Sequence, residues 1–309
     1  MQLQAASIGE AIPRDNFDAL IRSVFDSAVN MRLEGADRLI TLLISDHDEL
    51  PQGIRITDKN PALQSLTVGL RATCRGGILR FDSSPITIDL RGAPIWRCRV
   101  TELNTDMQSP SVIEAWSTAW DLLNKQQRLK KTELIAGDLF KLNTGSLLAQ
   151  KLGKSVLQLV PATEQFDVQG CSRAAEKMIG LGPGVTPSGD DLLIGYLAGL
   201  WSTAGSHQQQ SSFIRSFGIS LMKMAKQTNE ISRTYLYHAI HGQFSSNLST
   251  LAEAITTGHQ IEKAIQAAMR VGHSSGMDSV TGLLIGLAVW NQKSPNPLAS
   301  RGETGTHFS

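Results

Sequence analysis

The sequence has little cysteine, few aromatic residues, almost no charge excess and no long apolar run. Cys74, Cys98 and Cys171 lie far apart and form no CxxC pair, which argues against a disulfide framework and a thiolate zinc site. Lysine plus arginine number 29 against 28 acids, so a net charge of +1 gives no cationic surface for nucleic acid. The longest apolar runs, near 192–201 and 283–290, fall well short of the roughly 20 residues that span a bilayer.

Several familiar sequence signals are also missing. The N-terminus lacks the basic start and apolar segment of a signal peptide, so we expect a cytoplasmic protein without a membrane partner. There is no GxSxG elbow, no P-loop and no GxGxxG after a strand. These absences argue against a serine hydrolase, a Walker NTPase and a Rossmann dehydrogenase.

A change of texture near residue 110 predicts two domains in the chain of 309 residues. Before it, short apolar runs end at Gly, Pro, Asp or Asn, which is typical of an antiparallel sheet or small barrel. After it, Ser111 and Glu114 have the spacing of a capping box, and apolar residues follow at helical spacing. We therefore predict an α+β protein, with a β-rich domain at 1–108, an all-helical domain at 109–291 and a disordered tail at 292–309.

The predicted strands are Leu39–Ile44, Gly53–Ile56, Leu66–Thr73, Ile78–Phe81 and Ile86–Leu90. The predicted helices are 111–131, Ser146–Leu159, Cys171–Ile179, Gly189–Ser202, Ser211–Thr228, Ser232–Gly242, Leu248–Thr257, Ile261–Arg270 and Gly276–Asn291.

A loop rich in Gly and Pro leads directly into an apolar helix at residues 181–192. A helix start leaves about four backbone N–H groups without partners and carries roughly half a positive charge, so it can hold a phosphate or carboxylate. Gly182, Gly184 and Gly189 would let a ligand approach the backbone.

Two adjacent acids follow this loop. Ser188 and Asp191 have capping-box spacing, so they could simply satisfy the donors of their own helix. Capping requires only one acid, however, and Asp190 stands beside Asp191. The additional acid favours a divalent cation such as Mg²⁺ or a substrate amide as its partner, and Mg²⁺ is the only cofactor that the sequence suggests.

The last helix repeats this pattern 87 residues later, with Ser275–Leu287 matching Ser188–Leu200 at seven of 13 positions. In each helix a glycine pair four residues apart lies on one face, so the two helices can pack closely. A repeat that serves packing alone would give the same matches. If the two N-termini lie together, one cavity would collect three acids and three serines, namely Asp190, Asp191, Asp278, Ser188, Ser274 and Ser275.

A polar interruption at residues 228–235 separates these helices. Arg233 carries a fixed charge and a bidentate fork suited to carboxylate or phosphate, although a surface arginine is an alternative. Asn229 or Ser232 could serve only as an N-cap. His273 precedes the second serine-rich turn, where it could donate a proton or cap the preceding helix.

Three blocks of the sequence resemble signature blocks of the AllH-type family: LGPGVTPSGDDLLIG, TNEISRTYLYHAIHGQF and VGHSSGMDSVTGLLIG. The resemblance covers most of the chain and is strongest from about Cys171 to Trp290. The family includes the third subunit of bacterial oxamate carbamoyltransferase, and some members carry a carboxylase label. The resemblance implies carbamoyl transfer between oxamate and phosphate, giving or consuming carbamoyl phosphate in anaerobic allantoin (purine) breakdown, together with two other subunits.

The family's motif residues carry over by position. They are Gly182, Gly184, Thr186, Ser188, Gly189, Asp190, Asp191, Thr228, Ser232, Arg233, Ser274, Ser275, Gly276 and Asp278. We expect catalytic roles for the three acids and His273, metal binding by Asp190 and Asp191, and substrate or phosphate binding by the others. Val185 stands where the family often has Leu, and Leu192 where it often has an aromatic residue; neither change affects a polar atom.

Two classes of function remain open at this point. In the first, the chain is the catalytic part of a carbamoyltransferase, and its helix N-termini hold a phosphate. In the second, it is a non-catalytic subunit that binds a small carboxylate or serves assembly. A carboxylase-like enzyme is a further alternative.

Overall fold

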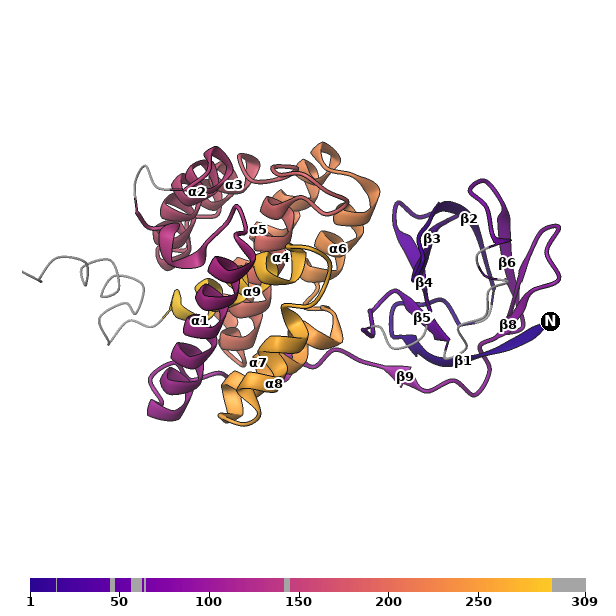
Figure 1. Ribbon diagram of the computed structural model, residues 1–309, viewed down its shortest axis with the longest axis horizontal. Coiled ribbons are helices and arrows are strands. Elements are labelled where there is room, and N and C mark those ends of the chain that lie inside the picture. The colour runs from indigo at the N-terminus through magenta and orange to yellow at the C-terminus, as the bar shows by residue number, and fades with distance from the viewer. Residues whose placement is uncertain (15, 45–47, 57–62, 64, 142–144, 291–309) are drawn as a thin grey trace, which may run out of the picture. The chain divides into compact units, whose positions relative to one another are not determined.

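The computed structural model describes residues 1–14, 16–44, 48–56, 63, 65–141 and 145–290. It divides the chain into two compact units, Met1–Cys98 and Arg99–Ser309. The first is a β-barrel and the second is helical, which confirms the predicted α+β class (Figure 1). A domain limit at residue 108 stays a prediction, and the tail predicted at 292–309 lies outside the described residues.

The described strands of the first unit are β1 (Gln2–Gly9), β2 (Phe17–Val24), β3 (Ala28–Leu33), β4 (Leu39–Ile44), β5 (Gly53–Ile56), β6 (Arg71–Arg75), β7 (Ile78–Phe81), β8 (Thr87–Asp89) and β9 (Ile95–Trp96). Their order is β5-β4-β3-β2-β6-β7-β8-β1, and β1 pairs again with β5, so the sheet closes on itself. β9 continues the pairing along the end of β1. Among the described strands, closure leaves no long edge to recruit another strand.

Strand direction departs from the expected antiparallel sheet at three places. β1 runs parallel to β8 and β9, and β4 runs parallel to β5. For β1 the reason is connectivity, because this strand closes the barrel against strands far along the chain and no hairpin sets its direction. The remaining pairs are antiparallel, as predicted.

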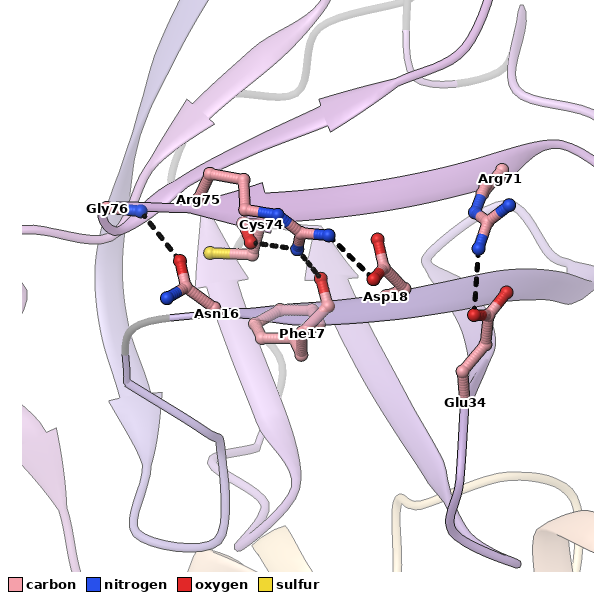
Figure 2. Close-up of polar contacts among 8 residues, drawn as sticks. All are labelled: Asn16, Phe17, Asp18, Glu34, Arg71, Cys74, Arg75 and Gly76. Atoms are coloured by element: carbon pink, nitrogen blue, oxygen red, sulfur yellow. Dashed lines mark hydrogen bonds and ion pairs between the residues drawn. The ribbon is translucent and has the colours of Figure 1, made fainter.

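The barrel is held by its interior rather than by the ion pairs on its surface. Along β2, Ala19 and Ile21 are fully buried, whereas Asp18 faces outward and accepts a hydrogen bond of 2.7 Å from Arg75 on β6 (Figure 2). This guanidinium holds the pKa of Asp18 below its usual value. Arg71 likewise donates a hydrogen bond to the carboxylate of Glu34. Such exposed pairs contribute little stability, because water and salt screen them.

The described α-helices of the second unit are α1 (Pro110–Lys130), α2 (Leu147–Glu164), α3 (Val168–Glu176), α4 (Ser188–Ala204), α5 (Gln208–Met224), α6 (Glu230–Ile240), α7 (Ser246–Thr257), α8 (Ile261–Ala268) and α9 (Ser275–Ala288), with short 3-10 turns η2 (Val100–Glu102), η3 (Ala136–Asp138) and η4 (Ala225–Gln227). Each predicted helix is present, with its ends shifted by a few residues. Asn291, the predicted end of the last one, lies outside the described residues.

The capping box predicted at Ser111 and Glu114 is wrong. α1 begins one residue earlier, at Pro110, and its N-cap Ser109 makes no side-chain capping bond. Proline supplies a helical φ and has no N–H to satisfy, so it starts the helix without a box.

Two of these helices, α4 and α9, pack backbone against backbone and run in the same direction. A Cβ on Gly195 would lie 1.8 Å from the carbonyl oxygen of Ser279, and one on Gly199 would lie 2.5 Å from that of Leu283. Contacts therefore advance together along both helices, which places their N-termini at the same end. The glycine faces predicted from the sequence form this contact.

A third helix fixes the position of α9. On α1, Trp116 donates its indole N–H to the Leu284 carbonyl at 2.7 Å, and Gln127 donates to the Thr281 hydroxyl at 3.1 Å. Both bonds are buried, where breaking one leaves a polar group unsatisfied at a cost of about 1–3 kcal/mol.

No helix in the described part of the chain has both the length and the apolar character that a membrane span needs.

We predict that Gly282→Ala destabilises the protein. In an open helix interior this change would stabilise by about 0.5–1 kcal/mol. Here the new Cβ would lie 2.0 Å from the Leu192 carbonyl oxygen, so the helices must separate. We expect a loss of about 1–3 kcal/mol in the free energy of unfolding, measured by denaturant titration. An unchanged or increased stability would contradict the close contact.

Candidate functional site

The loop between α3 and α4 is fastened to both other motif blocks. The Thr186 hydroxyl lies 2.7 Å from that of Ser275, at the start of α9. Asn229, the N-cap of α6, donates to the carbonyl of Val185 at 2.9 Å. The three blocks singled out in the sequence thus meet at one end of the helical unit.

Two glycines in this loop have backbones that other residues rarely adopt. Gly182 has φ +121°, and a Cβ there would lie 2.8 Å from the Ser188 nitrogen. Gly184 has φ +100° and its Cβ position is almost open. Gly182 therefore serves the turn into α4, and Gly184 is the position where a ligand could approach the backbone.

Asp190 is fully buried, and its carboxylate holds the loop to α6. One oxygen accepts the Gly180 amide at 2.8 Å, and the other accepts the Thr228 hydroxyl at 2.5 Å. Burial raises the pKa of Asp190, while the Thr228 hydroxyl and the Gly180 amide act in the opposite direction. Asp190 therefore has two protein partners that occupy it.

Asp191 and Asp278 lie together at the start of α4 and α9, as the sequence predicts. The charge of Asp278 contributes to raising the pKa of Asp191, so the two carboxyl groups are close to one another. Burial is the main cause that places the pKa of Asp191 well above its usual range. Burial also raises the pKa of Asp278 to about 6, although the hydroxyls of Ser188 and Ser274 oppose it.

These two acids lack the partners that Asp190 has. Within the described residues, one carboxylate oxygen of Asp191 and both oxygens of Asp278 are buried without a hydrogen bond of normal geometry. Hydroxyls of nearby serines and Thr186 lower the pKa of these two acids but leave three carboxylate oxygens without a hydrogen bond among the described residues. Buried polar atoms nearly always have a partner, so this arrangement requires an explanation.

The helix starts differ from the simple expectation of about four open amides. Ser188 is the first residue of α4 and Pro187 its N-cap, without a side-chain capping bond, so the capping box is not formed. The amides of Gly189, Asp190 and Asp191 are already bonded to carbonyls of Leu181 and Pro187. At α9, no acceptor for the amides of Ser275 and Met277 is found among the described residues.

The remaining predicted site residues occupy different environments. Gly189 and Gly276 pack against carbonyl oxygens of Met178 and Ala268, so glycine is required there for packing. Ser232 is fully buried on α6, and Arg233 beside it is partly exposed. His273 is exposed in the turn before α9.

Two residues near these acids escaped the sequence analysis. Glu133, exposed in the segment after α1, raises the pKa of Asp278 by its charge. Gly180 supplies the amide that binds Asp190. Neither stands in a motif, so only the tertiary structure shows them. Asn229 was considered as an N-cap, and it is one, accepting from the amides of Ile231 and Ser232.

Comparison with models of known protein families shows which family the chain belongs to. Residues 178–287 match the model for the oxamate carbamoyltransferase subunit AllH, and residues 4–95 match that of the AllH family N-terminal domain. The chain belongs to the AllH family. No solved structure matches it.

The matched ranges follow the two units of this AllH-family chain. The N-terminal model falls within the barrel. The other covers the glycine loop, α6 and nearly all of α9, and it includes Asp190, Asp191 and Asp278. The family name denotes a subunit of oxamate carbamoyltransferase, so membership supports a role in a complex with other subunits.

We predict that Asp278→Asn stabilises the chain above pH 6 but not near pH 4. The pKa of Asp278 is raised from 3.8 to about 6 in the folded state. Between these two pH values Asp278 ionises in the unfolded chain but stays protonated in the folded one, so the free energy of unfolding falls as the pH rises. Above that window the penalty is complete, about 3 kcal/mol for a shift of about two units. Asparagine removes it. Thermal melting of the wild type and the variant in a chelating buffer at pH 4 and pH 8 measures this change in stability. An equal change at both pH values would contradict the raised pKa of Asp278.

Proposed function

We propose that this chain is the subunit that binds the anionic substrates of a carbamoyltransferase, which acts on oxamate and carbamoyl phosphate in allantoin breakdown. The supporting observation is the shared end of α4 and α9, where Thr186 and Ser275 face each other. The family assignment points to the same class of reaction.

The reaction presents the protein with negatively charged oxygens on both sides. A carbamoyl carbon passes between the phosphate oxygen of carbamoyl phosphate and the nitrogen of oxamate, so one C–O bond breaks as one C–N bond forms. Phosphate and the oxamate carboxylate are both anions. Parallel helices present their partial positive charges at the same end, and this attracts an anion.

Specific donors complete the proposed site. The amides of Ser275 and Met277 and the hydroxyls of Thr186 and Ser275 would bind the phosphate of carbamoyl phosphate. The guanidinium of Arg233, in the first turn of α6, would donate two hydrogen bonds to the oxamate carboxylate. His273, exposed before α9, would exchange protons with the departing phosphate.

We predict that Ser275→Ala raises KM for carbamoyl phosphate. A hydrogen bond to a charged group is worth about 1.5–3 kcal/mol, which corresponds to about ten- to hundredfold. The assay is phosphate release from carbamoyl phosphate and oxamate by the complex reconstituted with its other subunits. Ser216→Ala, an exposed serine on α5, is the matched control and should behave like the wild type.

Two results would reject the proposal. One is a KM for carbamoyl phosphate that stays within twofold of the wild-type value in Ser275→Ala. The other is full turnover by the remaining subunits without this chain, which would assign it an assembly role.

A further inference from the structure

Three neighbouring acids of α4 and α9 differ in how their oxygens are satisfied. Asp190 has a partner for each oxygen, as described above. Asp191 and Asp278 are 5% and 1% exposed, and between them three carboxylate oxygens lack a hydrogen bond. The binding capacity at this end of the bundle therefore resides in the second pair, which comes from two different helices.

Apart from burial, the groups that act most strongly on Asp191 and Asp278 are hydroxyls of serine and threonine and neighbouring acids, and no cationic side chain is among them. Leaving a buried charge without compensation costs several kcal/mol. A neutral amide could donate hydrogen bonds to these carboxylates but would leave their charge in place, whereas a divalent cation would cancel it.

The donor atoms suit one class of cation. The polar side chains that act on the pair present oxygen, from Thr186, Ser188, Ser274 and Ser275 in addition to the carboxylates. Hard cations prefer oxygen, and Mg²⁺ typically uses one or two carboxylates, several waters and the phosphate of a substrate. No group of three or more His, Cys, Asp and Glu side chains in the described chain is arranged to hold a metal, so an ion here would have two carboxylates and would take its other ligands from hydroxyls, water or substrate.

We propose that Asp191 and Asp278 together bind one Mg²⁺ or Mn²⁺ ion between the starts of α4 and α9. Asp190 is then a positioning residue and not a ligand, in contrast to the pair Asp190 and Asp191 that the sequence favours. The ion would also offer open positions to an anionic oxygen beside the helix ends. This inference does not depend on carbamoyl transfer, and its test uses the metal alone.

The experiment is Mn²⁺ binding to the full chain at pH 8, followed by electron paramagnetic resonance of the free ion. The wild type should bind about one Mn²⁺ per chain, and Mg²⁺ should displace it. Asp278→Asn and Asp191→Asn should each weaken binding at least about tenfold, because each removes a direct ligand. Asp121→Asn, which removes an exposed acid from α1, is the matched control and should bind like the wild type.

Thermal melting provides a second measurement on the same samples. Mn²⁺ should raise the Tm of the wild type and of Asp121→Asn, and it should leave Asp278→Asn unchanged. Absence of stoichiometric Mn²⁺ binding by the wild type would overturn the proposal, whatever the variants do. Wild-type affinity in a folded Asp278→Asn chain would overturn it equally.

Discussion

The backbones of α4 and α9 touch because glycine occupies the contact on both sides, at Gly195, Gly199, Gly282 and Gly286. Side chains at these positions would collide with carbonyl oxygens of the opposite helix. The contact also fixes direction, and parallel helices bring their N-termini to one end. This arrangement positions the polar groups of the candidate site. They lie at the starts of α4 and α9, on the loop before α4, or at α6, which is bonded to that loop.

Burying the acids of the candidate site lowers the stability of the fold. Asp191 and Asp278 are buried among hydroxyls, and burial raises the pKa of both. A chain selected for stability alone would have placed apolar or paired residues there. Asp190 shows the alternative, since the Gly180 amide and the Thr228 hydroxyl satisfy it completely. The contrast between these unsatisfied oxygens and the satisfied Asp190 supports the proposal that Asp191 and Asp278 bind an ion.

Much of this arrangement is accessible from sequence because its signals are local. The repeated glycine spacing predicts the contact of α4 with α9 and the meeting of Asp191 with Asp278. The partners of Asp190 were not predictable, because Gly180 and Thr228 reach it only after the loop and α6 fold together. For the same reason, spacing along one helix could not separate the roles of Asp190 and Asp191.

The barrel shows a different limit of sequence analysis. Apolar runs revealed β4, β5, β7 and β8 and overlapped the first part of β6, whereas β1, β2, β3 and β9 were missed. In β2 the buried and outward residues alternate, so Asp18 and Arg22 interrupt the apolar pattern. Parallel pairing of β1 with β8 depends on residues far apart in the chain, and no turn signal between neighbouring strands encodes it.

The most direct test of the central claim is a disulfide between Thr186→Cys and Ser275→Cys. The two hydroxyls lie 2.7 Å apart, so thiols in their place would be within bonding range if α4 and α9 start side by side. We expect mild oxidation to cross-link the double variant, as judged by peptide mass mapping. Pairing Thr186→Cys with Ser279→Cys, one turn further along α9, should give no cross-link. Free thiols in the oxidised and folded Thr186→Cys/Ser275→Cys chain would contradict the account.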